Sequence, residues 1–164
     1  MTVREILTIP DQKLKTPVDT ATDISDFIRE VLTDLEETVE DSPGIALAAP
    51  QIGELVSAIH VDVSQDTRRD VPNHGKTSLI NPEITAESNP EVVREGCLSV
   101  PNYTGDVKRF QSVTVEALSR AGEPVRLEAT GWEAVAFQHE IDHLNGTLFL
   151  DRIERVREHL HKRT

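Results

Sequence analysis

A cluster of potentially reactive side chains lies near the C-terminal end of the sequence, in the run Gln138-His139-Glu140-Ile141-Asp142-His143. Two histidines at this spacing lie one above the other on one face of an α-helix, where both imidazoles can reach one metal ion. Glu140 then lies beside the metal, free to move protons rather than to bind it. Such a helix is costly to bury unless something binds its polar groups, so the run favours a catalytic metal site over ordinary core or surface residues.

The hydrophobic pattern around this run predicts a buried helix. Apolar residues recur every three or four positions, at Ala134, Phe137, Ile141 and Leu144. We expect the helix to begin after Thr130-Gly131 and to end at Leu144, where Asn145-Gly146 is a typical stop signal.

The rest of the chain predicts an α+β fold in one domain, residues 1–164, with mainly antiparallel strands around the C-terminal helix. A second helix of period 3.6 starts at about Asp23, with an acidic outer face. The run from Ile6 to Asp11 predicts an irregular or edge segment, and residues 152–161 predict a last helical turn or two. The expected strands are 55–63, 77–80, 84–87 paired with 91–94 as a hairpin, 107–117 and 125–129.

Composition excludes several classes of protein. The formal net charge is −12, which argues against bulk electrostatic binding to nucleic acid or to an anionic membrane. No apolar run approaches the roughly 18 residues of a membrane span, and no basic segment followed by an apolar one marks a secretory signal. We therefore expect a cytoplasmic protein with no membrane partner and no sequence-specific nucleic-acid partner, and we expect it to be a monomer.

Two further stretches could contribute to a site. Cys97 is the single cysteine, so it forms no intramolecular disulfide; a lone cysteine is most often a small buried hydrophobe. Residues 44–53 are small and apolar, are broken by Pro50, and include the amide of Gln51. Such a segment lets the backbone approach a ligand closely, although a tightly packed loop without a ligand has the same composition.

Taken together, Gly44-Ile45-Ala46-Leu47-Ala48-Ala49-Pro50-Gln51, Glu95-Gly96-Cys97-Leu98-Ser99 and the histidine run resemble, in this order, the three signature motifs of the peptide deformylases. The resemblance extends to residues 6–11 and 145–152, and so spans nearly the whole chain. It implies removal of the N-formyl group from formyl-methionine at the start of nascent polypeptides, with release of formate. It also implies a metal, typically Fe(II), with Zn(II), Ni(II) or Co(II) able to occupy the same site.

The resemblance assigns roles to individual residues. It implies that Cys97, His139 and His143 bind the metal and leave a fourth position for water, while Glu140 transfers protons. The Gln51 side-chain amide and the Leu98 backbone N–H would stabilise the oxygen that gains negative charge. Residues expected to orient the metal ligands are Arg109, Gln138 and Asp142.

The same resemblance implies an apolar pocket for the methionine side chain and an extended peptide that binds like an added strand. Glu95 and Gly96 would flank the peptide backbone, and a basic tail at residues 152–163 would be the place to look for ribosome contact. The expected pocket residues are Gly44, Ile45, Ala46, Val93, Trp132, Val135 and Ala136.

Two positions depart from the family pattern. Ala46 stands where the family has a second glycine, and Trp132 is bulkier than the expected aliphatic residue. These changes keep open a related metal-dependent amidase with another side-chain preference. A metalloprotease of the His-Glu-x-x-His type is disfavoured, because His159 and His161 are too near the tail to serve as a downstream ligand. An intact Glu140 disfavours a catalytically silent metal- or peptide-binding homologue.

Overall fold

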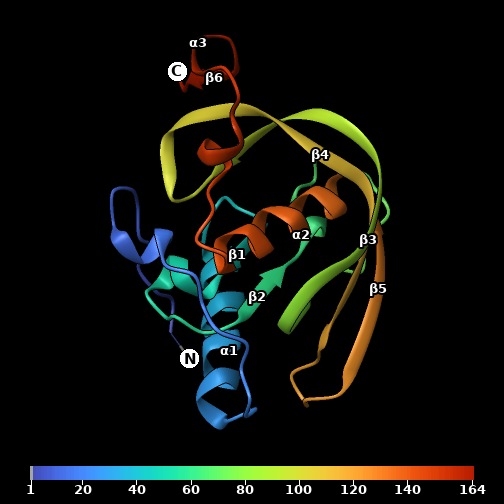
Figure 1. Ribbon diagram of the computed structural model, residues 1–164. Helices are drawn as coiled ribbons and strands as arrows, with labels where there is room; N and C mark the ends of the chain where they lie inside the picture. Colours follow the sequence, from blue (N-terminus) through green and yellow to red (C-terminus); the bar gives the residue numbers. More distant parts are fainter. Residues whose placement is uncertain (1) are drawn as a thin grey trace.

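The computed structural model describes residues 2–164 and shows an antiparallel sheet that curves around one helix (Figure 1). The sheet order is β1-β2-β3-β4-β5, and β6 pairs with β4. The strands are β1 Ala46–Ala48, β2 Ala58–Val61, β3 Thr77–Cys97, β4 Val100–Leu118, β5 Pro124–Thr130 and β6 Leu160–Lys162. The helices are α1 Asp26–Asp41, α2 Gly131–Leu144 and α3 Val156–His159. Short 3-10 helices span Gln12–Lys15, Ala49–Ile52, Val63–Gln65 and Phe149–Arg152. The predicted antiparallel α+β class is confirmed.

Helix α2 lies inside the curve of the sheet and is buried almost all round. It begins at Gly131, one residue before the predicted start, and ends at Leu144, as the sequence predicts. Ala134, Phe137 and Leu144 pack into a core cluster with side chains of β2, β4 and β5. Because this packing surrounds the helix, the polar groups on it are held away from water.

Helix α1 begins three residues later than the pattern alone indicates. The Ser25 hydroxyl accepts a hydrogen bond from the Ile28 backbone N–H at 3.4 Å, and this cap sets the start at Asp26. The apolar face of α1, with Leu32 and Leu35, packs on a second core cluster that includes Leu47 and Ala58 of the first two strands. This layer supports the loop that carries Gln51.

The predicted hairpin between 84–87 and 91–94 is wrong. Both segments belong to one long strand, β3, which pairs with β4 from Ile80 to Cys97 with register shifts at Ile80/Glu83, Ile84/Ala86 and Gly96/Cys97. Strand β2 covers only Thr77–Ile80 on the other side of β3. Pro82 and Pro90 therefore fall where β3 has no second neighbour and their missing N–H groups break no ladder bond.

Other boundaries also shift. β2 is shorter than the predicted 55–63, and β4 extends the predicted 107–117 by several residues toward Cys97. The tail forms one helical turn, α3, and then a strand that was not predicted, β6. The N-terminal segment is irregular, as predicted; its Leu7 and Ile9 N–H groups donate to the carbonyls of Gln51 and Ser99. No helix within residues 2–164 is long and apolar enough to cross a membrane.

Candidate metal centre

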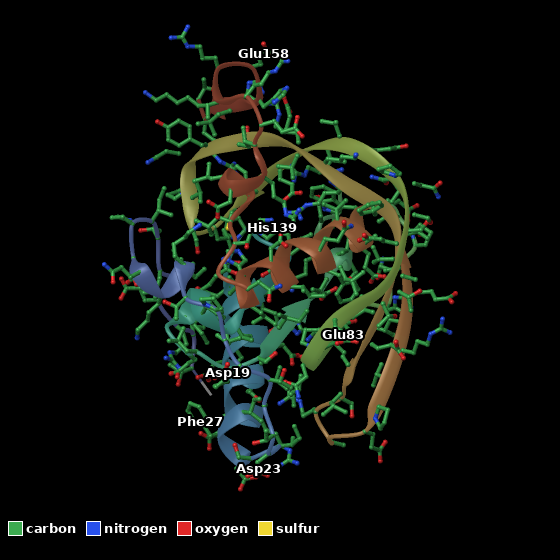
Figure 2. The ribbon with its side chains drawn as sticks, in the orientation of Figure 1. Asp19, Asp23, Phe27, Glu83, His139 and Glu158 are labelled. Atoms are coloured by element: carbon green, nitrogen blue, oxygen red, sulfur yellow. The ribbon has the colours of Figure 1, made fainter. Side chains whose placement is uncertain are left out.

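Helix α2 and the end of β3 bring Cys97, His139 and His143 together. One ligand atom from each lies within 4.8 Å of the other two, and Cys97 Sγ is 3.4 Å from His143 Nε2. Cys97 and His143 are 7% and 1% exposed, and the His139 side chain is 11% exposed. Figure 2 shows His139 on α2, inside the curve of β3 and β4.

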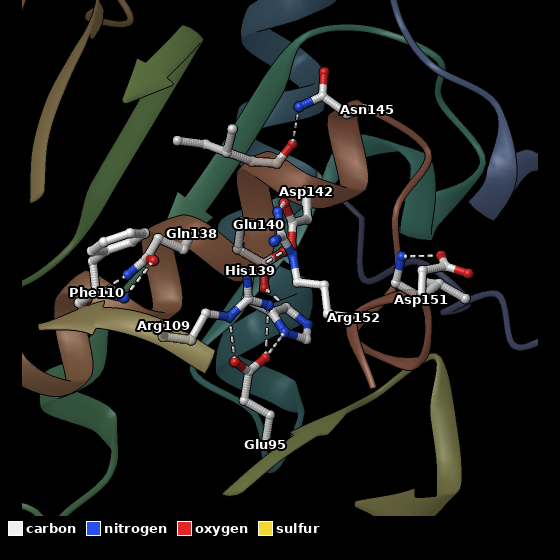
Figure 3. Close-up of polar contacts among 12 residues, drawn as sticks. Glu95, Arg109, Phe110, Gln138, His139, Glu140, Asp142, Asn145, Asp151 and Arg152 are labelled. Carbon is white, nitrogen blue, oxygen red and sulfur yellow. Dashed lines mark hydrogen bonds and ion pairs between the residues drawn. The ribbon is translucent and has the colours of Figure 1, made fainter. Parts of the chain in front are cut away.

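A buried ionic network holds His139 in place (Figure 3). The Glu95 carboxylate lies 2.7 Å from His139 Nδ1, which leaves the Nε2 lone pair for a metal. Arg109 donates to Glu95 from Nη2 at 3.0 Å and to Asp142 from Nη1 at 2.7 Å. Arg152 donates to the same Asp142 from the solvent side. The network thus ties β3, β4 and α2 together directly behind the imidazole.

The electrostatics of this network keep Glu95 ionised. Its burial opposes the charge, but the hydrogen bonds from His139 and Arg109 outweigh burial and lower the pKa of Glu95 to about 2. Arg109 is itself only 2% exposed, and its pKa is raised despite burial because two carboxylates surround it. A carboxylate that stays charged is a firm acceptor for the Nδ1–H group of His139.

The two histidines differ in their surroundings. Burial lowers the pKa of His139, but Cys97, Glu95 and Glu140 outweigh it and raise the pKa well above its usual value. Burial, together with the charges of His139 and Arg109, lowers the pKa of His143 well below its usual value. The surroundings of His139 therefore favour a positive charge, and those of His143 favour a neutral imidazole. Both conditions suit a bound cation. One thiolate and two imidazoles are a donor set that fits a divalent transition metal such as zinc or iron.

Glu140 faces this centre without a fixed partner. It is 3% exposed, its Oε1 lies 4.0 Å from His139 Nε2, and its Oε2 has no hydrogen-bond partner within residues 2–164. Burial raises the pKa of Glu140 to about 7; Glu95 and Asp142 add to the rise and His139 opposes it. A carboxyl that titrates near neutral pH can both accept and return a proton.

Gln51 is held with its amide aimed at the cysteine. Its Oε1 accepts from the Ala48 N–H at 2.9 Å, while its Nε2 donates to Ser99 Oγ at 3.0 Å and lies 3.7 Å from Cys97 Sγ. Leu98 lies in the turn after Cys97 and packs against Gly44, where an added Cβ would come 2.6 Å from Leu98 Cδ1. The Gly44 loop and the Cys97 turn therefore meet at one edge of the site.

A cavity of about 570 Å³ opens beside these groups, within the size range of small-ligand sites. Val93 is not among the residues that line it, although the next residue, Arg94, is. Predicted pocket residues that do line it are Gly44, Ile45, Ala46, Glu95, Gly96, Trp132, Val135 and Ala136.

The side chains of Gln138 and Glu95 have partners that the sequence analysis does not name. The Gln138 side chain accepts a hydrogen bond from the Phe110 backbone N–H and donates one to the Phe110 C=O, so it fastens α2 to β4. Glu95 lines the cavity, and its carboxylate also reaches His139 Nδ1. Strand alternation places Glu95 and Cys97 on the same face of β3, and this signal could have found the role of Glu95.

A buried cysteine beside two histidines and a carboxyl, with the histidines on a helix inside an antiparallel sheet, is typical of a class of metal-dependent hydrolases. The family model for polypeptide deformylase matches residues 3–159, and the chain belongs to this family. It is 42% identical to peptide deformylase 2 of Vibrio vulnificus over 161 residues, which are 98% of this chain and 92% of the relative. It is 41% identical to peptide deformylase 1 of Bacillus subtilis over 155 residues, which are 94% of this chain and 92% of the relative.

Solved structures agree with this assignment. The peptide deformylase from Ehrlichia chaffeensis in complex with actinonin matches with a TM-score of 0.88 and 34% identity, over 96% of this chain and 92% of that one. The class I type b peptide deformylase from Acinetobacter baumannii, with Met-Ala-Ser bound, matches with a TM-score of 0.86 and 32% identity. That match covers 93% of this chain and 99% of the other.

Proposed function

We propose that this chain removes the N-formyl group from formyl-methionine at the N-terminus of nascent polypeptides, by metal-dependent hydrolysis that releases formate. The observation that carries the proposal is the meeting of Cys97, His139 and His143 beside Glu140, in a chain of the deformylase family. The 164 residues would act as one catalytic domain.

Cys97, His139 and His143 would hold the metal. When bound, a divalent metal lowers the pKa of a coordinated water toward neutrality and polarises a carbonyl oxygen. We infer Fe(II) as the native ion, with Zn(II), Ni(II) or Co(II) able to replace it, from the family resemblance. The thiolate of Cys97 makes such a site sensitive to oxidation.

Glu140 would carry the proton. Its carboxylate takes the proton of the attacking water and returns it to the amine that leaves when the formyl C–N bond breaks. Its lack of a fixed partner and its pKa of about 7 suit both halves of this transfer. The Gln51 amide, held by Ala48 and Ser99, and the Leu98 N–H would donate to the formyl oxygen as it gains negative charge.

The substrate would lie in the cavity with its methionine side chain against α2. Val135, Ala136 and Trp132 give an apolar wall, and the tripeptide Met-Ala-Ser bound to the Acinetobacter relative supports a peptide in the corresponding place. Ala46 and Trp132 would adjust side-chain preference without touching the metal ligands. Equal turnover of a formyl-methionyl peptide by wild type and Ala46→Gly would argue against a role for Ala46.

We further propose that the protein is a monomer and works in the cytoplasm, where formylated nascent chains arise. The basic tail at residues 152–163 is the surface we would test first for ribosome contact. Reduced crosslinking of a charge-neutralised tail to ribosomes would support that contact.

The decisive experiment is anaerobic purification followed by metal analysis and a formate-release assay with a formyl-methionyl dipeptide. We expect stoichiometric metal and turnover, and a loss of about 10²- to 10⁴-fold in kcat for Glu140→Ala with the metal retained. Metal without turnover would direct attention to other formylated amides. A protein that binds no metal while Cys97 is reduced would contradict the proposal.

A further inference from the structure

The mouth of the cavity is basic although the chain carries a net charge of −12. Four arginines line it, from three separate parts of the chain. Arg68 and Arg69 follow the 3-10 helix Val63–Gln65, Arg94 lies near the end of β3, and Arg163 follows β6. We call these four residues the basic rim.

Three of the four are already paired with carboxylates. Arg68 and Arg69 both contact Asp66, at 3.0 and 3.3 Å, and Arg69 also stacks over the Trp132 ring at 4.0 Å. Arg94 Nε lies 2.6 Å from Asp106, a carboxylate that His161 also contacts. Because Asp66 is shared between two arginines, the basic rim keeps an excess of positive charge.

Arg163 is the arginine of the rim whose charge is uncompensated. Among the ion pairs formed within residues 2–164, none includes its guanidinium, whereas the other three arginines each have a carboxylate within 4.0 Å. Its backbone N–H donates to the Asn102 carbonyl at 2.9 Å, continuing the pairing in which His161 and Lys162 face Thr104 and Tyr103. The tail is thus fastened to β4, and the Arg163 side chain starts from a backbone position beside the cavity that it lines.

The Arg163 guanidinium lies directly over the strand next to the metal centre. A Cβ on Gly96 would come 2.2 Å from Arg163 Nη2, so glycine is what lets the two groups approach. Gly96 is exposed in the cavity and immediately precedes Cys97. A peptide that adds to this edge in extended form would pass beside the guanidinium just after its first residue.

We propose that the basic rim, with Arg163 as its main contact, is a specificity subsite for carboxylate side chains on the residues that follow formyl-methionine. An unpaired guanidinium offers a fork of N–H donors that matches a carboxylate. The carboxylate of Glu95, deeper in the cavity, does not compete, since it is held by Arg109 and His139. This inference rests on the proposed function, because it concerns the same substrate.

The test uses metal-loaded enzyme and three C-terminally amidated peptides: formyl-Met-Asp-Ser, formyl-Met-Asn-Ser and formyl-Met-Lys-Ser. At low salt we expect kcat/KM for the Asp peptide to exceed that for the Asn peptide by about two- to fivefold, the range of an exposed ion pair. The higher kcat/KM of the Asp peptide should come from a lower KM. The difference between the two peptides should decrease as added salt screens the attraction between carboxylate and guanidinium. A second series carries the charged side chain on the third residue instead of the second. The position with the larger preference for Asp shows which residue the subsite contacts.

A free peptide terminus offers the same chemistry as an acidic side chain. Formyl-Met-Asn-Ser with a free terminal carboxylate, compared with its amide, separates the two sources. A preference confined to the free terminus would overturn the inference, because nascent chains present no such group near the site. A preference that persists among the amidated peptides supports it.

Matched variants assign the effect to Arg163. Arg163→Glu should reverse the order of the Asp and Lys peptides, and Arg163→Lys should keep it. Arg157→Glu changes the net charge by the same amount on α3, at an exposed residue that does not line the cavity, and should leave the ratio unchanged. Equal effects of Arg157→Glu and Arg163→Glu would overturn the inference, as would equal kcat/KM values of the wild type for the Asp and Asn peptides. In either case, turnover of the Asn peptide would still support the proposed function. Failure to hydrolyse the Asn peptide would overturn both.

Discussion

Glu140 lies in surroundings that oppose its negative charge, so the ionised side chain lowers the stability of the folded protein. Its pKa rises from 4.5 to about 7, which at about 1.4 kcal/mol per unit costs the folded, metal-free protein roughly 3 kcal/mol above pH 7. Below pH 4.5 the carboxyl is protonated in both folded and unfolded states, and the cost disappears. Glu140, which the proposed reaction needs, therefore lowers the free energy of unfolding of the metal-free protein above pH 7.

We expect Glu140→Gln to raise the free energy of unfolding of the metal-free protein at pH 8 by up to roughly 3 kcal/mol. The gain should shrink as pH falls through 7 and vanish below about 4.5, because the wild-type side chain is then neutral as well. Urea unfolding at pH 8, 6 and 4.5 measures it. A variant less stable than wild type at pH 8 would show that Glu140 is stabilised there by a partner.

Glu95 holds the imidazole of His139 in place through the contact at Nδ1. Glu95→Gln should weaken metal binding by about 10- to 100-fold, because an amide is a poorer acceptor for the imidazole N–H and leaves Arg109 partly unpaired. Competition with a chelator measures the change. Glu133→Gln is the matched control, since Glu133, on α2, is as buried as Glu95 but contacts His74 instead of His139. Equal losses in both variants would assign the effect to helix stability.

At the scale of elements, the position of α2 depends on how its C-terminal end meets the N-terminal segment. Val18 N–H donates to the Leu144 carbonyl at 2.9 Å, and Gly146 has φ +71° in the following turn. A Cβ on Gly146 would lie 2.7 Å from the Lys15 carbonyl oxygen and 3.1 Å from Pro17 N. Both neighbours are backbone atoms, which cannot move aside as a flexible side chain can.

Gly146→Ala should therefore lower the free energy of unfolding by roughly 2–5 kcal/mol, the sum of left-handed strain and steric overlap. Gly75→Ala is the control: its φ is +68°, but nothing lies within 4 Å of the added Cβ. It should cost only about 1–2 kcal/mol, the strain alone. Denaturant unfolding of the two variants separates strain from overlap. Equal losses of unfolding free energy in the two variants would mean that the turn after α2 moves enough to accommodate the added methyl group.

The elements also show which parts of the molecule a sequence can predict. Helix α2 follows from its own residues, because the apolar period, Thr130 and Asn145 are all local signals. The length of β3 does not, because Pro82 and Pro90 break a strand only where a second neighbour needs their N–H groups. The inward turn of Glu95 and the pairing of β6 with β4 depend on residues far along the chain. The motifs thus predicted the three candidate ligands, Cys97, His139 and His143, which the fold brings together. The partners of these residues on other strands could be found only from the fold.

For the whole molecule, charge is distributed unevenly. The outer face of α1 is acidic and exposed, while arginines gather at the cavity mouth. Several surface ion pairs, such as Lys76 with Glu36, reduce the repulsion locally, but exposed pairs contribute only about 0–1 kcal/mol each. A chain with 29 acidic and 17 basic residues keeps a net repulsion that such pairs cannot cancel.

Salt should therefore stabilise this protein. Added NaCl screens the net repulsion and the ion pairs alike; because the repulsion acts among all charges, we expect its loss to outweigh the weakening of the pairs and Tm to rise by a few degrees. Most of the rise should come by about 0.1–0.2 M, where the screening length is about 10 Å or less. Sodium sulfate at equal ionic strength controls for salt-specific effects and should match NaCl in this range. A fall in Tm over the same range would mean that the ion pairs, Arg94 with Asp106 among them, outweigh the repulsion.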